Sequence, residues 1–110
     1  MNIIERVVCK HYNVSIDDIK GKSRKAHIVE PRHVIFFLTY KETPATFKAI
    51  AKLYGLHHSS VMHAVQKMEN NQKPIDDIRP LIIKAFWQSI KLEPYSVESK
   101  NFMADRYISL

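Results

Sequence analysis

A run of imidazole and hydroxyl side chains in the middle of the chain is the group best suited to chemistry. It reads His57-His58-Ser59-Ser60. The polar residues His63, Gln66 and Lys67 follow at helical spacing. Short polar side chains at the start of a helix suit entry into the major groove of DNA, where they can hydrogen-bond to base edges. A zinc site is the weaker interpretation, because adjacent histidines usually cannot both face one ion and no thiol or carboxylate joins them.

The charged residues supply a second group. The formal net charge of the 110-residue chain is +6, and residues 1–55 carry +5 of it. The excess gathers in and around GKSRKA, residues 21–26. An isolated basic loop is most simply a solvated one. Beside the helix at Ser59, phosphate contact by Lys22, Arg24 and Lys25 is favoured, and arginine is preferred in a narrow minor groove.

The elements that position these residues are predicted to be helices. Two glycines and five prolines are few breakers for this length, and alternating β-branched patterns are lacking. Ser15 and Asp18 have capping-box spacing, and Gly21 is placed to end that short helix. The expected helices cover about Asn2–Tyr12, Ile16–Lys20, His27–Lys41, Ala45–Tyr54, Ser59–Asn70 (capped by Ser59 or His58) and Asp76 or Asp77 to Leu92. We therefore predict an all-α domain of five or six helices.

Residues 47–64 have the pattern of a helix-turn-helix. Ala51 supplies the small side chain needed where two steeply crossing helices touch, and Gly55 tolerates the positive φ of the turn. The polar face of the second helix is then left outward. Lys48, Lys52 and Lys67 are further candidate phosphate contacts.

Other residues are assigned to the core or to turns. Pro31 and Pro80 are placed in first helical turns, with a bend as the alternative for Pro31. The core is expected to include Phe36, Phe37, Phe86 and Trp87. For His63, a buried position against Phe47 or Phe37 is the alternative to DNA contact.

Several classes of protein are disfavoured. The length suits one domain, expected over residues 1–92, with a tail over 93–110 whose Tyr95, Phe102 and Tyr107 are candidates for a partner surface. No apolar run suits a membrane span, and the first residues do not resemble a secretory signal. Cys9 is the one cysteine, so a disulfide framework is excluded. No catalytic set, glycine-rich phosphate loop or cofactor motif is present, so we expect neither an enzyme nor a cofactor.

Two separated motifs resemble one known family. GKSRKAHIVEPRH (21–33) and GLHHSSVMHA (55–64) are similar to the basic loop with Pro-Arg and to the motif Gly-Arg-Asp-His-Thr-Thr-Val-x-His-Ala in the C-terminal DNA-binding domain of DnaA, the bacterial replication initiator. IDDIKGKSRK (16–25) also fits that family. The resemblance covers about residues 1–90 and implies a Trp-repressor-like fold, here as a freestanding domain without the initiator's ATPase.

Carried over by position, the resemblance implies a role for each matched residue. Arg24 matches the arginine that enters the minor groove, and Arg32 matches an arginine that contacts DNA backbone or bases. The matches to the recognition helix are His58, Ser59, Ser60 and His63. Two positions depart from the family: Leu56 replaces an arginine, and His57 replaces the aspartate that reads a base. A different target sequence is therefore expected.

The function predicted is binding of double-stranded DNA with sequence specificity, in the cytoplasm at the nucleoid. The alternative is a protein-interaction module on the same scaffold that binds an initiator or another replication or regulatory protein without reading DNA. No membrane attachment is expected. The oligomeric state is left open by the sequence: a monomer is favoured, and a dimer formed through the tail is the alternative.

Overall fold

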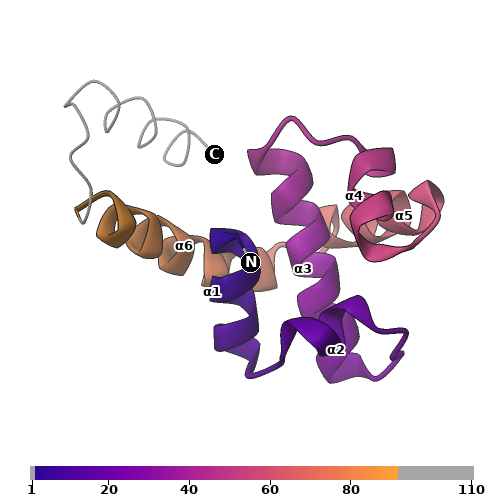
Figure 1. Cartoon of the computed structure of the whole chain (residues 1–110), viewed down its shortest axis with the longest axis horizontal. Helices are drawn as coiled ribbons and strands as arrows, with labels where there is room; N and C mark the ends of the chain where they lie inside the picture. The colour runs from indigo at the N-terminus through magenta and orange to yellow at the C-terminus, as the bar shows by residue number, and fades with distance from the viewer. Residues whose placement is uncertain (1, 92–110) are drawn as a thin grey trace.

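The computed structural model describes residues 2–91, with side chains described through Ser89, and this part of the chain is all-α (Figure 1). The fold class predicted from the sequence is confirmed. The helices of the described residues are α1 (Ile3–Tyr12), α2 (Ile16–Lys20), α3 (Ala26–Glu42), α4 (Phe47–Tyr54), α5 (His58–Glu69) and α6 (Lys73–Lys91). The predicted tail, residues 93–110, lies outside the described residues.

Local sequence explains where the first helices begin and end. Asn2 and Ser15 each cap a helix through a reciprocal capping box, with Glu5 and Asp18 as the respective partners. The Ser15–Asp18 box was predicted and is confirmed. Asn13 ends α1 in the left-handed conformation, which asparagine tolerates better than most residues. Gly21 ends α2 as expected, although its backbone is extended there.

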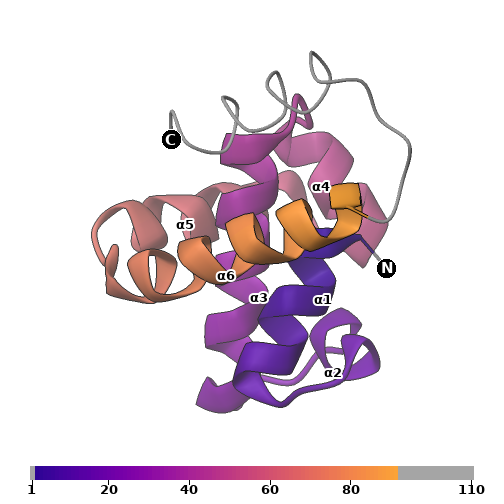
Figure 2. The ribbon, with the colours of Figure 1, turned by 90° about the vertical axis from the view of Figure 1, so that its left-hand side faces the viewer.

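Helix α3 is the centre of the fold. It packs against α1 on one side and α5 on the other, while α4 packs on α5 and α6 packs along α1 (Figures 1 and 2). The core is built largely from α3, whose Val34, Ile35 and Leu38 are fully buried. Phe36, Phe37 and Phe86 are buried as predicted, whereas Trp87 is half-buried at the edge.

The placement of Pro31 and Pro80 in first helical turns is wrong. Helix α3 begins at Ala26, so Pro31 lies in its second turn, where it is buried. Helix α6 begins at Lys73, so Pro80 lies in its interior, and Pro74 occupies the first turn instead. A first-turn proline is tolerated because its missing N–H has no helical acceptor. Burial of Ile75 and Ile78 gives this earlier start an apolar face to pack.

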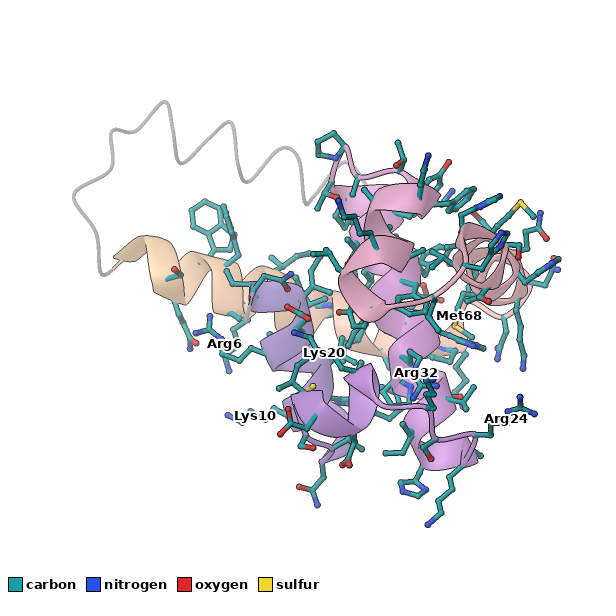
Figure 3. The ribbon with its side chains drawn as sticks, turned by 45° about the vertical axis from the view of Figure 1, so that its right-hand side comes forward. Arg6, Lys10, Lys20, Arg24, Arg32 and Met68 are labelled. Atoms are coloured by element: carbon teal, nitrogen blue, oxygen red, sulfur yellow. The ribbon has the colours of Figure 1, made fainter. Side chains whose placement is uncertain are left out.

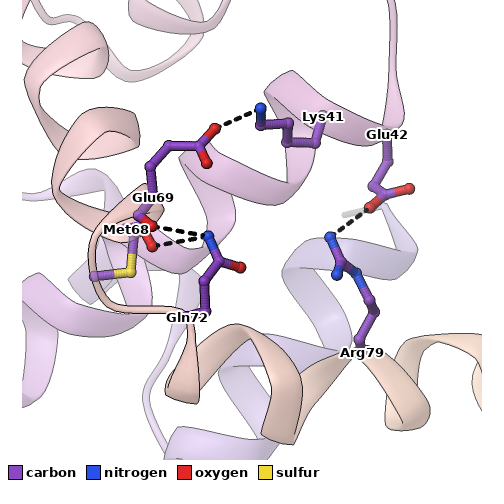
Figure 4. Close-up of polar contacts among 6 residues, drawn as sticks. All are labelled: Lys41, Glu42, Met68, Glu69, Gln72 and Arg79. Atoms are coloured by element: carbon purple, nitrogen blue, oxygen red, sulfur yellow. Dashed lines mark hydrogen bonds and ion pairs between the residues drawn. The ribbon is translucent and has the colours of Figure 1, made fainter. Parts of the chain in front are cut away.

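Two polar contacts join helices that are distant in sequence, and a third caps one of these helices locally. The Tyr54 hydroxyl on α4 donates to Glu5 Oε2 on α1 over 2.7 Å. Lys41 pairs with Glu69 and so ties α3 to the end of α5 (Figure 4). Gln72 Nε2 donates to the carbonyls of Met68 and Glu69, each at 3.2 Å, and so caps that same end.

A buried carboxylate joins α3 to α6. Glu42 is 4% exposed and lies 3.7 Å from the Arg79 guanidinium (Figure 4). Removing a buried carboxylate from water is costly, so the nearby arginine offsets part of that cost.

No helix among the described residues is long and apolar enough to cross a membrane.

Candidate nucleic-acid interface

Helices α4 and α5 form the helix-turn-helix expected from residues 47–64. Ala51 is 2% exposed at their contact, and Gly55 has φ +65°, the left-handed value predicted for the turn. The Leu56 N–H donates to the Ala51 carbonyl over 2.9 Å, which closes the end of α4. On α5, Val61 and Ala64 face the core. The short turn therefore sets the angle at which α5 is presented.

The residue that caps α5 is His57, not the predicted Ser59 or His58. Its backbone is extended, and its ring Nδ1 accepts from the Ser59 N–H at 3.2 Å. The same nitrogen lies 2.7 Å from Ser59 Oγ. The ring also rests on that of His58, with centroids 4.2 Å apart. Serine is a preferred helix cap and histidine is not, so the residue preferences of helix caps did not predict His57.

The outward face of α5 carries the polar residues predicted for base reading. His58, Ser60, His63 and Lys67 are exposed, and Ser59 is half-buried. The alternative of a buried His63 is therefore wrong: Val61, Ala64, Val65 and Met68 fill the inward positions instead. One face of the helix is left free of core packing over three turns.

The basic loop is held from behind by Arg32. Its Nε donates to the Ile19 carbonyl at 2.8 Å and its Nη1 to the Ser23 carbonyl at 2.9 Å. Its Nη2 donates to Gly21 at 3.0 Å and, less closely, to Asp18 at 3.4 Å. All three guanidinium nitrogens thus bind the end of α2 and the loop. Burial lowers the pKa of Arg32.

This role of Arg32 was not identified from the sequence. The resemblance assigns it to DNA contact, whereas its described hydrogen bonds are to backbone within the protein. The acceptors lie nine to fourteen residues earlier in the chain. No local spacing rule connects positions so far apart, so only the fold could reveal the contact.

The cations of the loop itself point into solvent. Lys22, Arg24 and Lys25 are all exposed. Figure 3 shows Arg24 projecting from the loop on the side of the molecule that carries α5, whereas Arg6 and Lys10 project from α1 on the other side. Lys48 and Lys52 are exposed on α4. The loop and the outward face of α5 are therefore available on one side of the domain.

No group of three histidine, cysteine, aspartate or glutamate side chains within the described residues is arranged to hold a metal ion.

The fold and this interface define a helix-turn-helix domain with an accompanying basic loop. The model of the bacterial DnaA protein helix-turn-helix family matches residues 1–68, and the chain belongs to this family. It is an all-α, DNA-binding helix-turn-helix domain.

Curated relatives agree with that assignment. The chain is 30% identical over 83 residues, 76% of its length, to the chromosomal replication initiator protein DnaA of Desulfatibacillum aliphaticivorans. It is 42% identical over 67 residues, 60% of its length, to that of Rhizobium meliloti (strain 1021), and 40% identical over 68 residues, 61% of its length, to that of Brucella abortus biovar 1 (strain 9-941). These alignments span only 18%, 14% and 14% of the respective relatives.

Proposed function

We propose that this domain binds double-stranded DNA with sequence specificity, with α5 in the major groove and the loop of residues 21–25 against the adjacent minor groove or phosphates. The observation that carries the proposal is that Arg24 projects on the side of the molecule where α5 lies (Figure 3), while most polar candidate residues of α5 are exposed. A helix and a nearby cationic loop can contact neighbouring grooves of one duplex.

The candidate residues fall into groups with different contacts to DNA. His57, His58, Ser59, Ser60 and His63 face base edges or the adjoining backbone. The phosphate contacts are Lys22, Lys25, Lys48, Lys52 and Lys67, and Arg24 enters the minor groove. Arg32 acts through the loop: its hydrogen bonds to four carbonyls hold the conformation in which these cations are presented.

The test is selection from a random double-stranded oligonucleotide pool at two salt concentrations, with sequencing of the retained DNA. About five phosphate contacts give a slope of log K against log salt near −4 to −5. An enriched motif supports sequence-specific reading, and a slope near zero contradicts DNA binding. A motif without two-fold repetition supports action as a monomer, because a dimer needs half-sites roughly 10 bp apart or a multiple of that. The site of action is the cytoplasm, where the chromosome lies.

A groove between α1 and α6 favours a second function, the binding of a protein. It encloses about 680 Å³, with Val7, Leu81 and Ala85 among its apolar lining and Lys10 and Lys84 among its cations. None of the described residues that line it is acidic. This composition suits an acidic amphipathic segment of a partner, such as another replication protein. The predicted tail, residues 93–110, is a further candidate surface.

The two functions are separable by substitution. Arg24→Ala weakens DNA binding and leaves protein binding unchanged, whereas Leu81→Asp does the reverse. Calorimetry with purified full-length initiator from the same cell measures the second function. Loss of initiator binding by Arg24→Ala, with no effect of Leu81→Asp, contradicts the assignment of the groove.

A further inference from the structure

The contact between His57 and Ser59 determines whether the free nitrogen of the His57 ring, at the start of α5, donates or accepts a hydrogen bond. A backbone N–H can only donate, and the Ser59 N–H points at His57 Nδ1 from 3.2 Å. Nδ1 must therefore hold a lone pair and carry no hydrogen. The proton of the neutral ring is consequently on Nε2. If the proton were on Nδ1 instead, the Nδ1–H and the Ser59 N–H would point at each other.

Ser59 Oγ follows from the same contact. It lies 2.7 Å from Nδ1, so its hydroxyl hydrogen is directed at that lone pair. Its oxygen then offers only lone pairs to other groups. His57 and Ser59 thus form a fixed pair, a donor at Nε2 followed by an acceptor at Oγ.

The ring is held in this orientation by its surroundings. His57 is exposed and caps the first turn of α5, and the His58 ring lies against it at an interplanar angle of 35°. In the ring held this way, Nε2 is the nitrogen that can donate a hydrogen bond.

We propose that His57 is a specificity-determining residue that donates from Nε2 to a base presenting acceptors in the major groove, guanine above all. Guanine offers N7 and O6 side by side, whereas cytosine offers the N4 amino donor. An aspartate at this position, as in the family motif, can only accept and so selects the opposite kind of edge. This inference rests on the proposed function and deepens it, since it requires α5 to lie in the major groove.

The experiment compares motifs selected from the random pool by the unaltered protein and by His57→Asp. Aspartate is a preferred helix cap, so α5 keeps its first turn and the variant is expected to fold. The expected result is a change at one motif position, from guanine in the unaltered protein to cytosine or adenine in the variant. Circular dichroism of both proteins checks that helix content is equal.

Two controls and one further variant complete the comparison. His11→Asp makes the same chemical change on α1, at an exposed position outside the interface, and leaves the motif unchanged. A guanine analogue that lacks the N7 acceptor, placed at the assigned position, weakens binding of the unaltered protein about fivefold or more and leaves His57→Asp unaffected. His57→Asn keeps the cap and offers both a donor and an acceptor, so it relaxes the preference at that position.

The outcomes separate this inference from the proposed function. Absence of salt-sensitive retention contradicts DNA binding itself. Retention without any motif, or the same motif from the unaltered protein and His57→Asp, leaves DNA binding standing and overturns the role of His57. Selection of cytosine at that position by the unaltered protein also overturns it.

Discussion

Replacing Arg32 by alanine tests whether an arginine that hydrogen-bonds to the backbone of the loop can control DNA affinity. The substitution removes hydrogen bonds of 2.8, 2.9 and 3.0 Å to the carbonyls of Ile19, Ser23 and Gly21, together with a weaker one of 3.4 Å to Asp18. The side chains of Lys22, Arg24 and Lys25 are unchanged. What changes is the energy that holds their backbone in one conformation.

The three shorter bonds set the size of the effect. At about 1 kcal/mol net for each, their sum is about 3 kcal/mol. Water can replace the arginine at the exposed Gly21 carbonyl, which lowers the loss to about 2 kcal/mol. If the loop must return to its ordered conformation on DNA, the affinity falls by up to about 30-fold.

Arg32→Lys separates this role from direct phosphate contact. Lysine keeps the positive charge but not the planar fork that reaches several carbonyls at once. A positioning role therefore makes Arg32→Lys nearly as weak as Arg32→Ala. A phosphate contact would be largely restored by lysine, which binds phosphate as a point charge.

The assay is a double-mutant cycle with Arg24→Ala, measured as the dissociation constant of the selected DNA at fixed salt. If Arg32 acts through the loop, the double variant loses less affinity than the two single losses combined, with a coupling of about 1 kcal/mol or more. Losses that add to within about 0.5 kcal/mol, together with rescue by lysine, would refute the positioning argument. Thermal unfolding of each variant identifies any loss of folded protein.

Three further predictions concern stability. Gly55→Ala should lower the free energy of unfolding by about 1 kcal/mol, since a Cβ there meets no atom within 4 Å and only the positive φ is unfavourable. Gly55→Asn should lower that free energy less, and equal decreases for the two variants in urea unfolding would point to another cause. Burial, with Lys67 and Arg32 nearby, lowers the pKa of His33 below its ordinary 6.5, so the unfolded chain takes up a proton first as the pH falls. Stability should therefore decrease as the pH drops from about 6.5 to the folded-state pKa, and melting temperatures of His33→Gln should show a smaller decrease. Arg79→Met should lower the free energy of unfolding by about 2 to 3 kcal/mol, because Glu42 is left buried without that cation. Partial exposure of Arg79 keeps this decrease below that expected for a fully buried pair. An unchanged urea midpoint would show that the pair adds no net stability.

Much of the fold was predictable because its signals are local. The Ser15–Asp18 capping box, Ala51 and Gly55 each act within a few residues of their own position, so each can be identified from the sequence alone. The exceptions are also local but ambiguous. Helix α6 begins at Lys73, with Pro74 in its first turn, where proline is favoured. Because Pro80 could equally have occupied a first turn, the sequence was compatible with two helix starts, and the later one was predicted.

Candidate interface residues could be chosen from the sequence, but the hydrogen bonds among them could not be predicted from it. The candidate residues on α5 and in the loop are exposed as expected, except for Ser59, which is half-buried. Histidine is an uncommon cap, so nothing in the sequence favoured His57 over its serine neighbours. The donor at Nε2 therefore emerged only from the placement of the ring.

By itself the sequence determined an all-α domain, a helix-turn-helix, a basic loop and membership of the DnaA C-terminal family, because periodicity, capping and motif order are written along the chain. Only the tertiary structure decided that Arg32 supports the loop and that Tyr54 bonds to Glu5 across 49 positions. Such contacts depend on the packing of α3 and α4 against helices that precede them. A side chain forms a hydrogen bond only with groups that the fold brings within about 3 Å of it, and that distance cannot be read from the spacing of residues along the chain.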